Sequence, residues 1–285
     1  MIPVSFDYRR ATSIDDALDA LAANDGSMLI AGGHSLIPVL RFRLAQPARV
    51  VDIGRLAELK GISDHQGGVR IGAGTTYREV LASRLVTDRY PMLKEAIEVI
   101  GDTQVRNRGT IGGSLAHADP ASDLPACMIV LDAAIELRSK RGTRTVPARA
   151  FFTGAFETVK APDELLTAVI IPPLPAGAGT TYLKYEAAAS GYAIAAVAAV
   201  ITRTGGKITR ADLAFTGIGD HSFLLPAGQK LVGTEGGAAV IAQVADESVQ
   251  GVDITGDVHA PAEYRAHLAK VALRRAVERA LSRAR

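Results

Sequence analysis

The sequence has one cysteine, no long apolar run and little excess of charge of either sign. The lone cysteine, Cys127, can form no disulfide within the chain, which fits a reducing compartment. It also cannot hold an iron–sulfur cluster, because such a cluster needs several thiolate ligands. The residues around it, 127–131, are apolar, and this predicts a buried thiol.

Membrane insertion and secretion are not expected from this sequence. The longest apolar run, residues 193–201, is much shorter than a membrane span. Residues 1–7 lack the basic and apolar regions of a signal peptide. We therefore expect a cytoplasmic protein without a membrane span.

The distribution of charge argues against a nucleic-acid partner. The net charge of the 285 residues is +2, and both signs are interspersed. A nucleic-acid surface needs a clustered basic footprint. The one basic concentration, residues 274–285, is interpreted as the solvated face of a terminal helix. The chain is long enough for two domains or one large one.

Two glycine-rich polar stretches are the most informative feature of the chain. The first is Ala31-Gly32-Gly33-His34-Ser35-Leu36, and the second begins at Thr110-Ile111-Gly112-Gly113-Ser114 and runs to Asp123. Adjacent glycines beside hydroxyl side chains can expose backbone N–H groups to an anion. Two such stretches indicate a long ligand with more than one polar section, such as a dinucleotide.

Neither stretch fits the common nucleotide-binding motifs. Neither reads G-x-G-x-x-G or matches a P-loop, and Gly72-Ala73-Gly74 lacks the third glycine. His117, Asp119 and Asp123 could mimic a metal site, but Pro120 and small residues between them favour a tight turn. We expect no metal site in this chain and no side chain that acts as a catalytic acid or base.

The pattern along the chain predicts an α+β protein in several units. Ser13 is the expected N-cap of a first helix, with Asp16 in a capping box and Gly26 at the end. Gly205-Gly206 is the expected turn of a late hairpin. The other predicted elements are strands 28–30 and 50–53, a helix or turn at 36–44, strand 68–74, helices 76–83 and 92–100, a hairpin of 134–138 with 143–146, strand 166–171, a linker at 172–179, strands 180–186, 192–204 and 207–217, and helices 238–249 and 261–283.

The two glycine-rich stretches and several later segments resemble a known family. The first stretch, continued by Ile37-Pro38, closely resembles the first flavin loop of the FAD-binding medium subunit of molybdenum hydroxylases, such as carbon monoxide dehydrogenases and xanthine dehydrogenases. The second stretch, to Pro120, is similar to their second flavin loop. The resemblance continues through Tyr182-Leu183-Lys184-Tyr185, Ser190-Gly191-Tyr192-Ala193 and the closing segment 264–276. It therefore covers essentially the whole chain.

The resemblance implies a fold of the vanillyl-alcohol-oxidase (PCMH) type. Residues 1–175 would form the FAD-binding domain, with two α/β subdomains at about 1–55 and 56–175. Residues 176–285 would form a C-terminal α+β domain with a three- or four-stranded antiparallel sheet.

The resemblance also implies roles for particular residues. Residues 31–36 and 110–114 would offer backbone N–H groups and hydroxyls to the FAD pyrophosphate. Asp123 would accept a hydrogen bond from a ribose or ribityl hydroxyl, or would cap the following turn. Lys184 would lie near the flavin or the pyrophosphate, and Tyr192 would stack on the isoalloxazine. His34 is interpreted as a loop donor and His117 as a structural histidine, so FAD would be bound non-covalently. The set is Ala31, Gly32, Gly33, His34, Ser35, Leu36, Thr110, Ile111, Gly112, Gly113, Ser114, Asp123, Lys184 and Tyr192.

The implied function is electron transfer as an oxidoreductase subunit. FAD would pass electrons from the [2Fe–2S] clusters of a small partner to quinone, oxygen or NAD, while a large partner would carry the molybdenum cofactor. The expected assembly is a heterotrimer, doubled as (αβγ)2, with peripheral attachment at the inner membrane face left open. Ser114, where many xanthine dehydrogenases have Asn, favours the carbon-monoxide-dehydrogenase branch.

Several alternatives stay open on the residues alone. One is the FAD subunit of a xanthine, nicotine or other N-heterocycle dehydrogenase. Another is a free-standing flavin oxidoreductase, although such enzymes usually carry a larger substrate cap than the part of this chain after residue 179. A scaffold subunit that has lost its flavin is a further alternative, and the intact glycine stretches argue against it.

Overall fold

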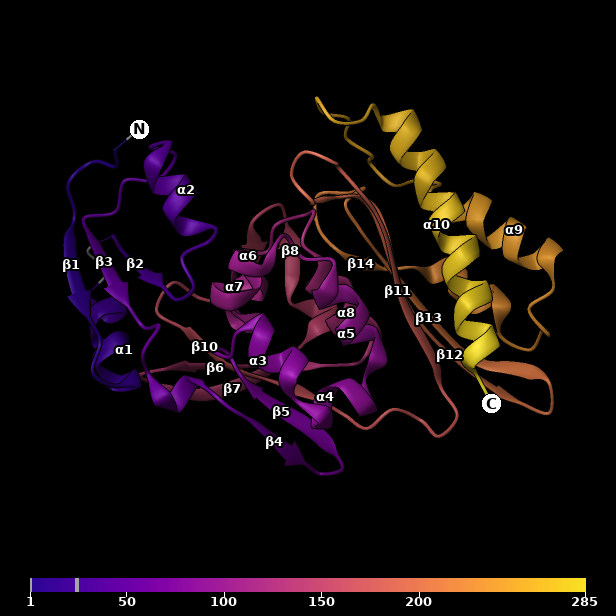
Figure 1. The fold of residues 1–285 in the computed structure, drawn as a ribbon, viewed down its shortest axis with the longest axis horizontal. Helices are drawn as coiled ribbons and strands as arrows, with labels where there is room; N and C mark the ends of the chain where they lie inside the picture. The colour runs from indigo at the N-terminus through magenta and orange to yellow at the C-terminus, as the bar shows by residue number, and fades with distance from the viewer. Residues whose placement is uncertain (1, 24–25) are drawn as a thin grey trace.

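The computed structural model describes residues 2–23 and 26–285, and its N-terminal part is a small parallel sheet. Strands β1 (Asp7–Arg10), β3 (Arg49–Asp52) and β2 (Ser27–Ile30) pair in parallel in that order. Helices α1 (Ile14–Ala22) and α2 (Leu36–Arg41) accompany the sheet, at the left of Figure 1. The predicted strands and helices of this unit are therefore present. The predicted first subdomain also includes Met1 and residues 24–25, which lie outside the described residues.

The ends of α1 differ in detail from the prediction. Ser13 caps the helix by accepting from the Asp16 backbone N–H, as expected. The Asp16 carboxylate accepts from the backbone N–H of Thr12 instead of returning to Ser13. The helix ends at Ala22 with Ala23 as its C-cap, and the predicted terminator Gly26 follows with φ of 75°.

The middle of the chain forms a five-stranded antiparallel sheet with helices packed on it. The strand order is β4 (Ile62–His65), β5 (Gly68–Gly72), β10 (Leu165–Ile171), β6 (Ala134–Ser139) and β7 (Gly142–Pro147). The helices are α3 (Tyr77–Ala82), α4 (Arg84–Arg89), α5 (Pro91–Glu98), α6 (Thr103–Arg108), α7 (Ile111–His117) and α8 (Asp123–Val130). A short hairpin of β8 (Phe152–Gly154) and β9 (Glu157–Thr158) follows.

Helices α4, α6, α7 and α8 occupy stretches without a predicted helix, and two of them involve the second glycine stretch and the segment after it. The second glycine stretch, expected as a loop, forms α7, whose first turn is capped by Thr110. The apolar segment after it belongs to α8, all of whose residues are buried. Cys127 lies in α8 as a buried free thiol, which confirms the prediction for it.

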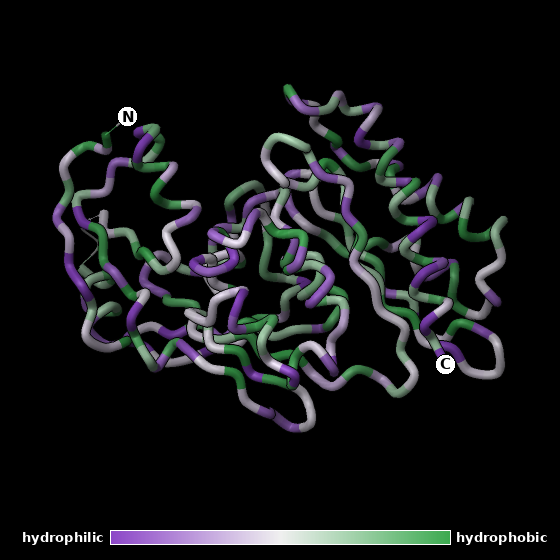
Figure 2. Tube along the Cα trace, viewed as in Figure 1, coloured by the Kyte–Doolittle hydropathy of each residue, from purple (hydrophilic) through white to green (hydrophobic). Residues whose placement is uncertain are grey.

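The C-terminal part is a four-stranded antiparallel sheet between two helix layers. Its strands are β11 (Gly179–Glu186), β12 (Ala193–Thr204), β13 (Lys207–Thr216) and β14 (Phe223–Leu224), in that order. Helices α9 (Ala238–Glu247) and α10 (Ala262–Arg283) cover one face, at the right of Figure 1. Figure 2 shows α10 alternating between hydrophilic and hydrophobic residues, as expected for a helix that covers a sheet with one side.

The other face of this sheet shares a core with the middle of the chain. Ala196, Ala198 and Val200 of β12 belong to the same apolar cluster as α5 and α8. The alternate residues Ala195 and Val197 belong to the cluster with α9 and α10. A strand buried on both faces must be apolar throughout, which accounts for the continuous run 193–201.

The basic C-terminal segment is only partly a solvated helix face. Arg279 and Arg283 of α10 both pair with Glu95 of α5, at 3.0 and 2.7 Å. The Arg275 guanidinium donates to the Tyr185 hydroxyl. These contacts fix the last helix against the rest of the chain.

Candidate functional site

A cavity of about 830 Å³ is lined by both glycine stretches and connects the N-terminal and middle parts of the chain. The first stretch contributes all of residues 31–36. The second contributes Thr110, Gly112, Gly113 and Ser114, whereas Ile111 is fully buried in the core behind them. In Figure 1 the first stretch is found just before α2, and the second contains α7. The structure therefore brings together two segments that are far apart in the sequence.

The first glycine stretch offers a row of hydrogen-bond donors to this cavity. The backbone N–H groups of residues 32–35 donate to no other described residue. Ser35 is the N-cap of α2, yet its hydroxyl makes no capping hydrogen bond. Buried or half-buried backbone donors are normally paired, so this row fits an anionic ligand that accepts from them.

The second stretch differs, because the backbone N–H groups of residues 111–114 donate within the protein. The N–H groups of Ile111 and Gly112 donate to the carbonyls of Thr75 and Ala73, at 3.0 and 2.9 Å. The Gly113 N–H donates to the Thr110 hydroxyl oxygen at 3.1 Å. What this stretch offers the cavity is shape and hydroxyl groups rather than a second row of backbone donors.

Two of the glycines are needed for close packing. A Cβ atom on Gly32 would lie 2.1 Å from the carbonyl oxygen of Arg108. A Cβ on Gly112 would lie 2.4 Å from the Cβ of Ala73. Real Cβ atoms do not approach other atoms so closely, so these glycines let backbone and helix meet. Composition alone could not separate this role from ligand binding.

Asp123 forms a buried polar group with two residues of β11. Its carboxylate accepts from the Tyr182 hydroxyl at 2.6 Å and lies 3.0 Å from the Lys184 ammonium. Burial raises the pKa of Asp123 to about 6, although the Lys184 charge acts in the opposite direction. The carboxylate lines the cavity, so it can still accept from a ligand hydroxyl.

Lys184 is placed one layer behind the cavity wall. Its side chain is only 2% exposed, and its ammonium also donates to the Val99 carbonyl oxygen at 2.7 Å. It does not belong to the cavity lining, which contains Asp123 in front of it. The position suits a residue that holds the Asp123 carboxylate.

Tyr192, His34 and His117 are ring side chains in the cavity wall. Tyr192 lies in the connection between β11 and β12, lines the cavity and is 49% exposed. His34 lines the cavity as an exposed residue of the first stretch. His117, at the end of α7, is half-buried, and burial lowers its pKa while Asp119 acts in the opposite direction. The described residues contain no group of three His, Cys, Asp or Glu side chains placed to hold a metal ion.

Other lining residues carry no motif that the sequence reveals. Tyr77 of α3 lines the cavity as a buried side chain, and burial raises its pKa to about 12. Lys160, just after β9, also lines the cavity, and its ammonium donates to the Ala161 carbonyl oxygen at 3.1 Å. Burial lowers the pKa of Lys160. A lysine after a strand and a tyrosine in a helix are common, so only the fold identifies them.

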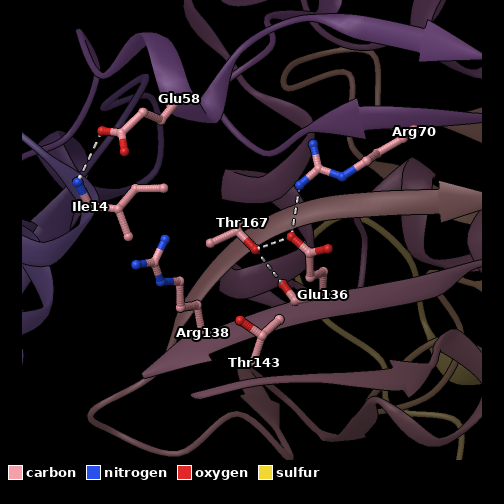
Figure 3. Close-up of a pocket in the computed structure, with 7 residues that line it drawn as sticks. All are labelled: Ile14, Glu58, Arg70, Glu136, Arg138, Thr143 and Thr167. Atoms are coloured by element: carbon pink, nitrogen blue, oxygen red, sulfur yellow. Dashed lines mark hydrogen bonds and ion pairs between the residues drawn. The ribbon is translucent and has the colours of Figure 1, made fainter. Parts of the chain in front are cut away.

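A smaller cavity of about 290 Å³ lies at the contact between α1 and the five-stranded sheet (Figure 3). The Glu58 carboxylate accepts from the Ile14 backbone N–H at 3.2 Å. The Glu136 carboxylate accepts from the Arg70 guanidinium and from the Thr167 hydroxyl, both at 2.7 Å. Because the Glu58 and Glu136 carboxylates are already held by partners within the protein, this cavity is interpreted as a structural contact between the two parts.

The helices of the fold were compared with the length and hydropathy of a membrane span. Over residues 2–23 and 26–285, no helix is both long and apolar enough to cross a membrane.

Comparison with known families covers most of the chain. Residues 4–174 match the FAD binding domain in molybdopterin dehydrogenase, and residues 180–280 match the CO dehydrogenase flavoprotein C-terminal domain. The chain is 41% identical to the carbon monoxide dehydrogenase medium chain of Afipia carboxidovorans, over 100% of both chains. It is 37% identical to the alpha subunit of the 6-hydroxypseudooxynicotine dehydrogenase complex of Paenarthrobacter nicotinovorans, over 100% of this chain and 97% of the relative.

Solved structures agree with these relatives. A chain of the carbon monoxide dehydrogenase of Hydrogenophaga pseudoflava matches with a TM-score of 0.97 at 34% identity, over 100% of both chains. A chain of the Cu,Mo carbon monoxide dehydrogenase in its cyanide-inactivated form matches with a TM-score of 0.96 at 41% identity, also over 100% of both chains.

Proposed function

The chain belongs to the FAD-binding subunits of molybdenum hydroxylases, and on this premise we propose that its large cavity holds FAD between a [2Fe–2S] partner and an external electron acceptor. The family and the fold expected from the two glycine stretches are thereby confirmed. The chain is an oxidoreductase subunit, and its relatives are medium subunits of complexes with several chains.

One observation carries the placement of FAD. Residues 32–35 line the cavity, and their backbone N–H groups have no acceptor among the described residues. A pyrophosphate supplies oxygen acceptors for such a row of donors. The cavity also continues along both stretches to Asp123 and Tyr192, which suits an extended dinucleotide.

Different residues of the cavity would bind different parts of FAD. Residues 32–35 and the hydroxyls of Ser35 and Thr110 would bind the pyrophosphate. Asp123, held by Tyr182 and Lys184, would accept from a ribose or ribityl hydroxyl. Bound FAD supplies the redox chemistry, since a flavin exchanges one or two electrons at a time.

The rings and the shape of the cavity complete the site. Tyr192 would stack on the isoalloxazine, and His34 would act as a donor without a covalent bond to FAD. Ala31, Leu36, Gly113 and Ser114 would shape the walls, with Gly32, Ile111 and Gly112 supporting them from the packing side. No side chain of this chain is assigned as a catalytic acid or base.

The finer features of the assembly are part of this proposal. A large subunit would carry the molybdenum cofactor and a small subunit the [2Fe–2S] clusters, in an (αβγ)2 complex in the cytoplasm or at the inner membrane face. The FAD-binding domain would comprise residues 1–175, and residues 176–285 the C-terminal domain. The complex would be most similar to a carbon monoxide dehydrogenase, with N-heterocycles such as nicotine as the alternative substrate class.

A visible absorption spectrum of the purified chain, before and after incubation with FAD, tests the proposal. We expect flavin absorption at one FAD per chain, and release of the flavin into the supernatant on acid precipitation. Flavin in the pellet would disprove the non-covalent interpretation of His34. A chain that neither contains nor takes up FAD would disprove the function itself.

A further inference from the structure

The end of β13 contacts the turn that leads into α8. The Thr216 hydroxyl lies 2.8 Å from the carbonyl oxygens of both Pro120 and Ser122. The Gly217 backbone N–H donates to the same Pro120 carbonyl at 2.9 Å. A hydroxyl carries one proton, and Gly217 already serves Pro120, so the Thr216 proton is available to Ser122. Thr216 is buried, so water does not compete for these acceptors.

The turn that Thr216 holds carries side chains of the large cavity. Asp119, Ser122 and Asp123 all line that cavity. The Ser122 backbone N–H donates to the Asp119 carbonyl oxygen at 2.9 Å, which closes the turn. The Ser122 hydroxyl lies 2.7 Å from the Ser114 hydroxyl of the second glycine stretch and makes no capping bond to α8. The place of the turn therefore decides where Ser122 and Asp123 face the cavity.

Arg265, in the first turn of α10, connects two strand ends of the C-terminal sheet. Its guanidinium donates to the Gly217 carbonyl oxygen, just after β13, at 2.6 Å. It also donates to the Ile194 carbonyl oxygen, at the start of β12, at 3.0 Å, and pairs with Asp257 at 2.6 Å. Tyr192 of the cavity wall stands immediately before β12. One buried guanidinium thus holds the strand ends beside two parts of that wall.

These polar contacts differ in kind from those that hold the sheet in place. The sheet packs on α9 and α10 through one apolar cluster and on α5 and α8 through another. Apolar packing is not directional, so it brings surfaces together without aiming a single group. Hydrogen bonds weaken steeply when they are bent, so they can fix the direction of a turn or a side chain. Groups that bind a ligand need such support, because errors of about 0.5 Å already weaken their contacts.

We propose that Thr216 and Arg265 are positioning residues for the flavin end of the cavity, which is the end lined by Asp123 and Tyr192. Thr216 fixes the turn that presents Ser122 and Asp123. Arg265 fixes the strand ends that carry Thr216 and Tyr192. This rests on the proposed function, because these groups have a flavin to bind only if the cavity holds FAD. The last helix thereby acts on a cavity that none of its own residues lines.

Thr216→Val tests the first contact, because valine has the shape of threonine without its hydroxyl. We expect the Kd for FAD to rise about fivefold in a fluorescence titration. Thr202→Val is the matched control, since the Thr202 hydroxyl on β12 pairs with that of Thr209 at 2.8 Å and neither residue lines the cavity. Each substitution removes one side-chain hydrogen bond from the same sheet. Chemical denaturation without FAD should therefore show similar losses of stability, whereas only Thr216→Val should bind FAD more weakly.

Arg265→Lys tests the second contact through the fluorescence of the bound flavin. Lysine keeps the charge but loses the planar fork that reaches both strand ends. Because Arg265 aims Tyr192, the fluorescence of the FAD-saturated chain should rise when the ring no longer stacks on the flavin. The same substitution should add nothing in Tyr192→Ala, where the quenching ring is already absent. Arg275→Lys is the control on the same helix, since its guanidinium donates to the Tyr185 hydroxyl, and it should leave the fluorescence unchanged.

The outcomes distinguish the positioning residues from the FAD site itself. Absence of FAD binding by the unchanged chain would overturn the proposed function together with this inference. FAD binding by the unchanged chain, with equal Kd in Thr216→Val and Thr202→Val, would overturn the role of Thr216 alone. A rise in fluorescence from Arg265→Lys that is the same with and without the Tyr192 ring would overturn the role of Arg265. So would fluorescence that Arg265→Lys leaves unchanged.

Discussion

Gly32 stands directly against the backbone of Arg108, so that a Cβ atom at residue 32 would lie 2.1 Å from the Arg108 carbonyl oxygen. Gly32 belongs to the part of the chain around β2, and Arg108 ends α6 in the middle part. The two parts therefore meet through backbone atoms, immediately beside both glycine stretches. This contact fixes the distance between the two walls of the cavity.

Gly32→Ala should separate these walls. The added methyl group has only backbone atoms in front of it, so we expect a loss of about 1–3 kcal/mol in the free energy of unfolding and lower FAD content. Gly237→Ala is the control, because a Cβ at residue 237 meets no atom within 4 Å. Chemical denaturation and flavin absorption measure both variants. Equal FAD content and stability in Gly32→Ala and the unchanged chain would contradict the importance of the contact.

Ser35→Ala should weaken FAD binding without weakening the fold. The Ser35 hydroxyl makes no capping bond to α2, so its removal leaves no partner unpaired within the chain. Loss of one hydrogen bond to the pyrophosphate corresponds to about 1 kcal/mol, or roughly a fivefold higher Kd for FAD. Ser83→Ala is the matched control, since Ser83 is the N-cap of α4 and also lacks a capping bond. An equal effect of both substitutions on the Kd would rule out a specific role for Ser35.

Tyr192→Ala should loosen the flavin ring. Loss of an offset stack is expected to raise the Kd for FAD by roughly three- to tenfold, and to increase flavin fluorescence because the quenching ring is gone. Tyr192→Phe should keep both properties. Tyr264→Ala removes a tyrosine of similar exposure on α10, 48% against 49%, and should leave FAD unchanged. Fluorescence titration with FAD measures all three variants.

Asp123 should make stability depend on pH in the direction opposite to most carboxylates. Burial raises its pKa to about 6 in the folded chain, above the ordinary aspartate value of 3.8 that applies when the chain is unfolded. Its contribution to stability is therefore complete below about pH 4 and is lost as the pH rises through 6. The difference in unfolding free energy between the unchanged chain and Asp123→Asn should fall over this interval. A difference that is constant or rises from pH 4 to 6 would show that the carboxyl is not held in this way.

Glu95→Ala should detach the C-terminal helix. The Glu95 carboxylate accepts from the Tyr182 backbone N–H at 2.9 Å and pairs with Arg279 and Arg283, so its loss should cost about 3 kcal/mol. Burial works against its ionisation, but these partners hold the pKa of Glu95 below its usual value. The stabilisation is thus present at neutral pH and lost as the pH falls through that lowered pKa.

Glu98→Ala is the control for Glu95→Ala. Glu98 is also on α5, but within residues 2–23 and 26–285 it pairs only with Lys94, at 3.9 Å on the exposed side of the helix. Its removal should change the free energy of unfolding by less than about 0.5 kcal/mol. Thermal denaturation with the same buffer and FAD concentration compares the two variants.

Much of the fold could be predicted because local patterns and tertiary packing agree. The cap at Ser13, the hairpin turn at Gly205-Gly206 and the linker before residue 179 all stand where the sequence indicated them. Agreement fails at α7, because two glycines are poor helix formers. There the packing of Gly112 on Ala73 and the cap at Thr110 outweigh local preference.

The site could be predicted in outline but not in its division of roles. Glycines and hydroxyls identified the two stretches that line the cavity. The N–H groups of residues 32–35 have no acceptor among the described residues, whereas those of residues 111–114 donate within the protein. Whether a backbone N–H is free depends on the strand or loop beside it, as the carbonyls of Ala73 and Thr75 show. Lys184 illustrates the same limit, because its place behind Asp123 follows from a contact between distant elements.

The core shared by β12, α5 and α8 has a consequence during synthesis of the protein. When the segment up to β10 has left the ribosome, the sides of α5 and α8 that pack on β11–β13 remain uncovered until those strands follow. The two matched family domains end and begin at residues 174 and 180. A nascent chain that stops between them thus leaves part of its apolar core exposed. A nascent chain on a ribosome stalled there would expose apolar surface. Chaperone binding to nascent chains should therefore be greatest before residue 216 emerges.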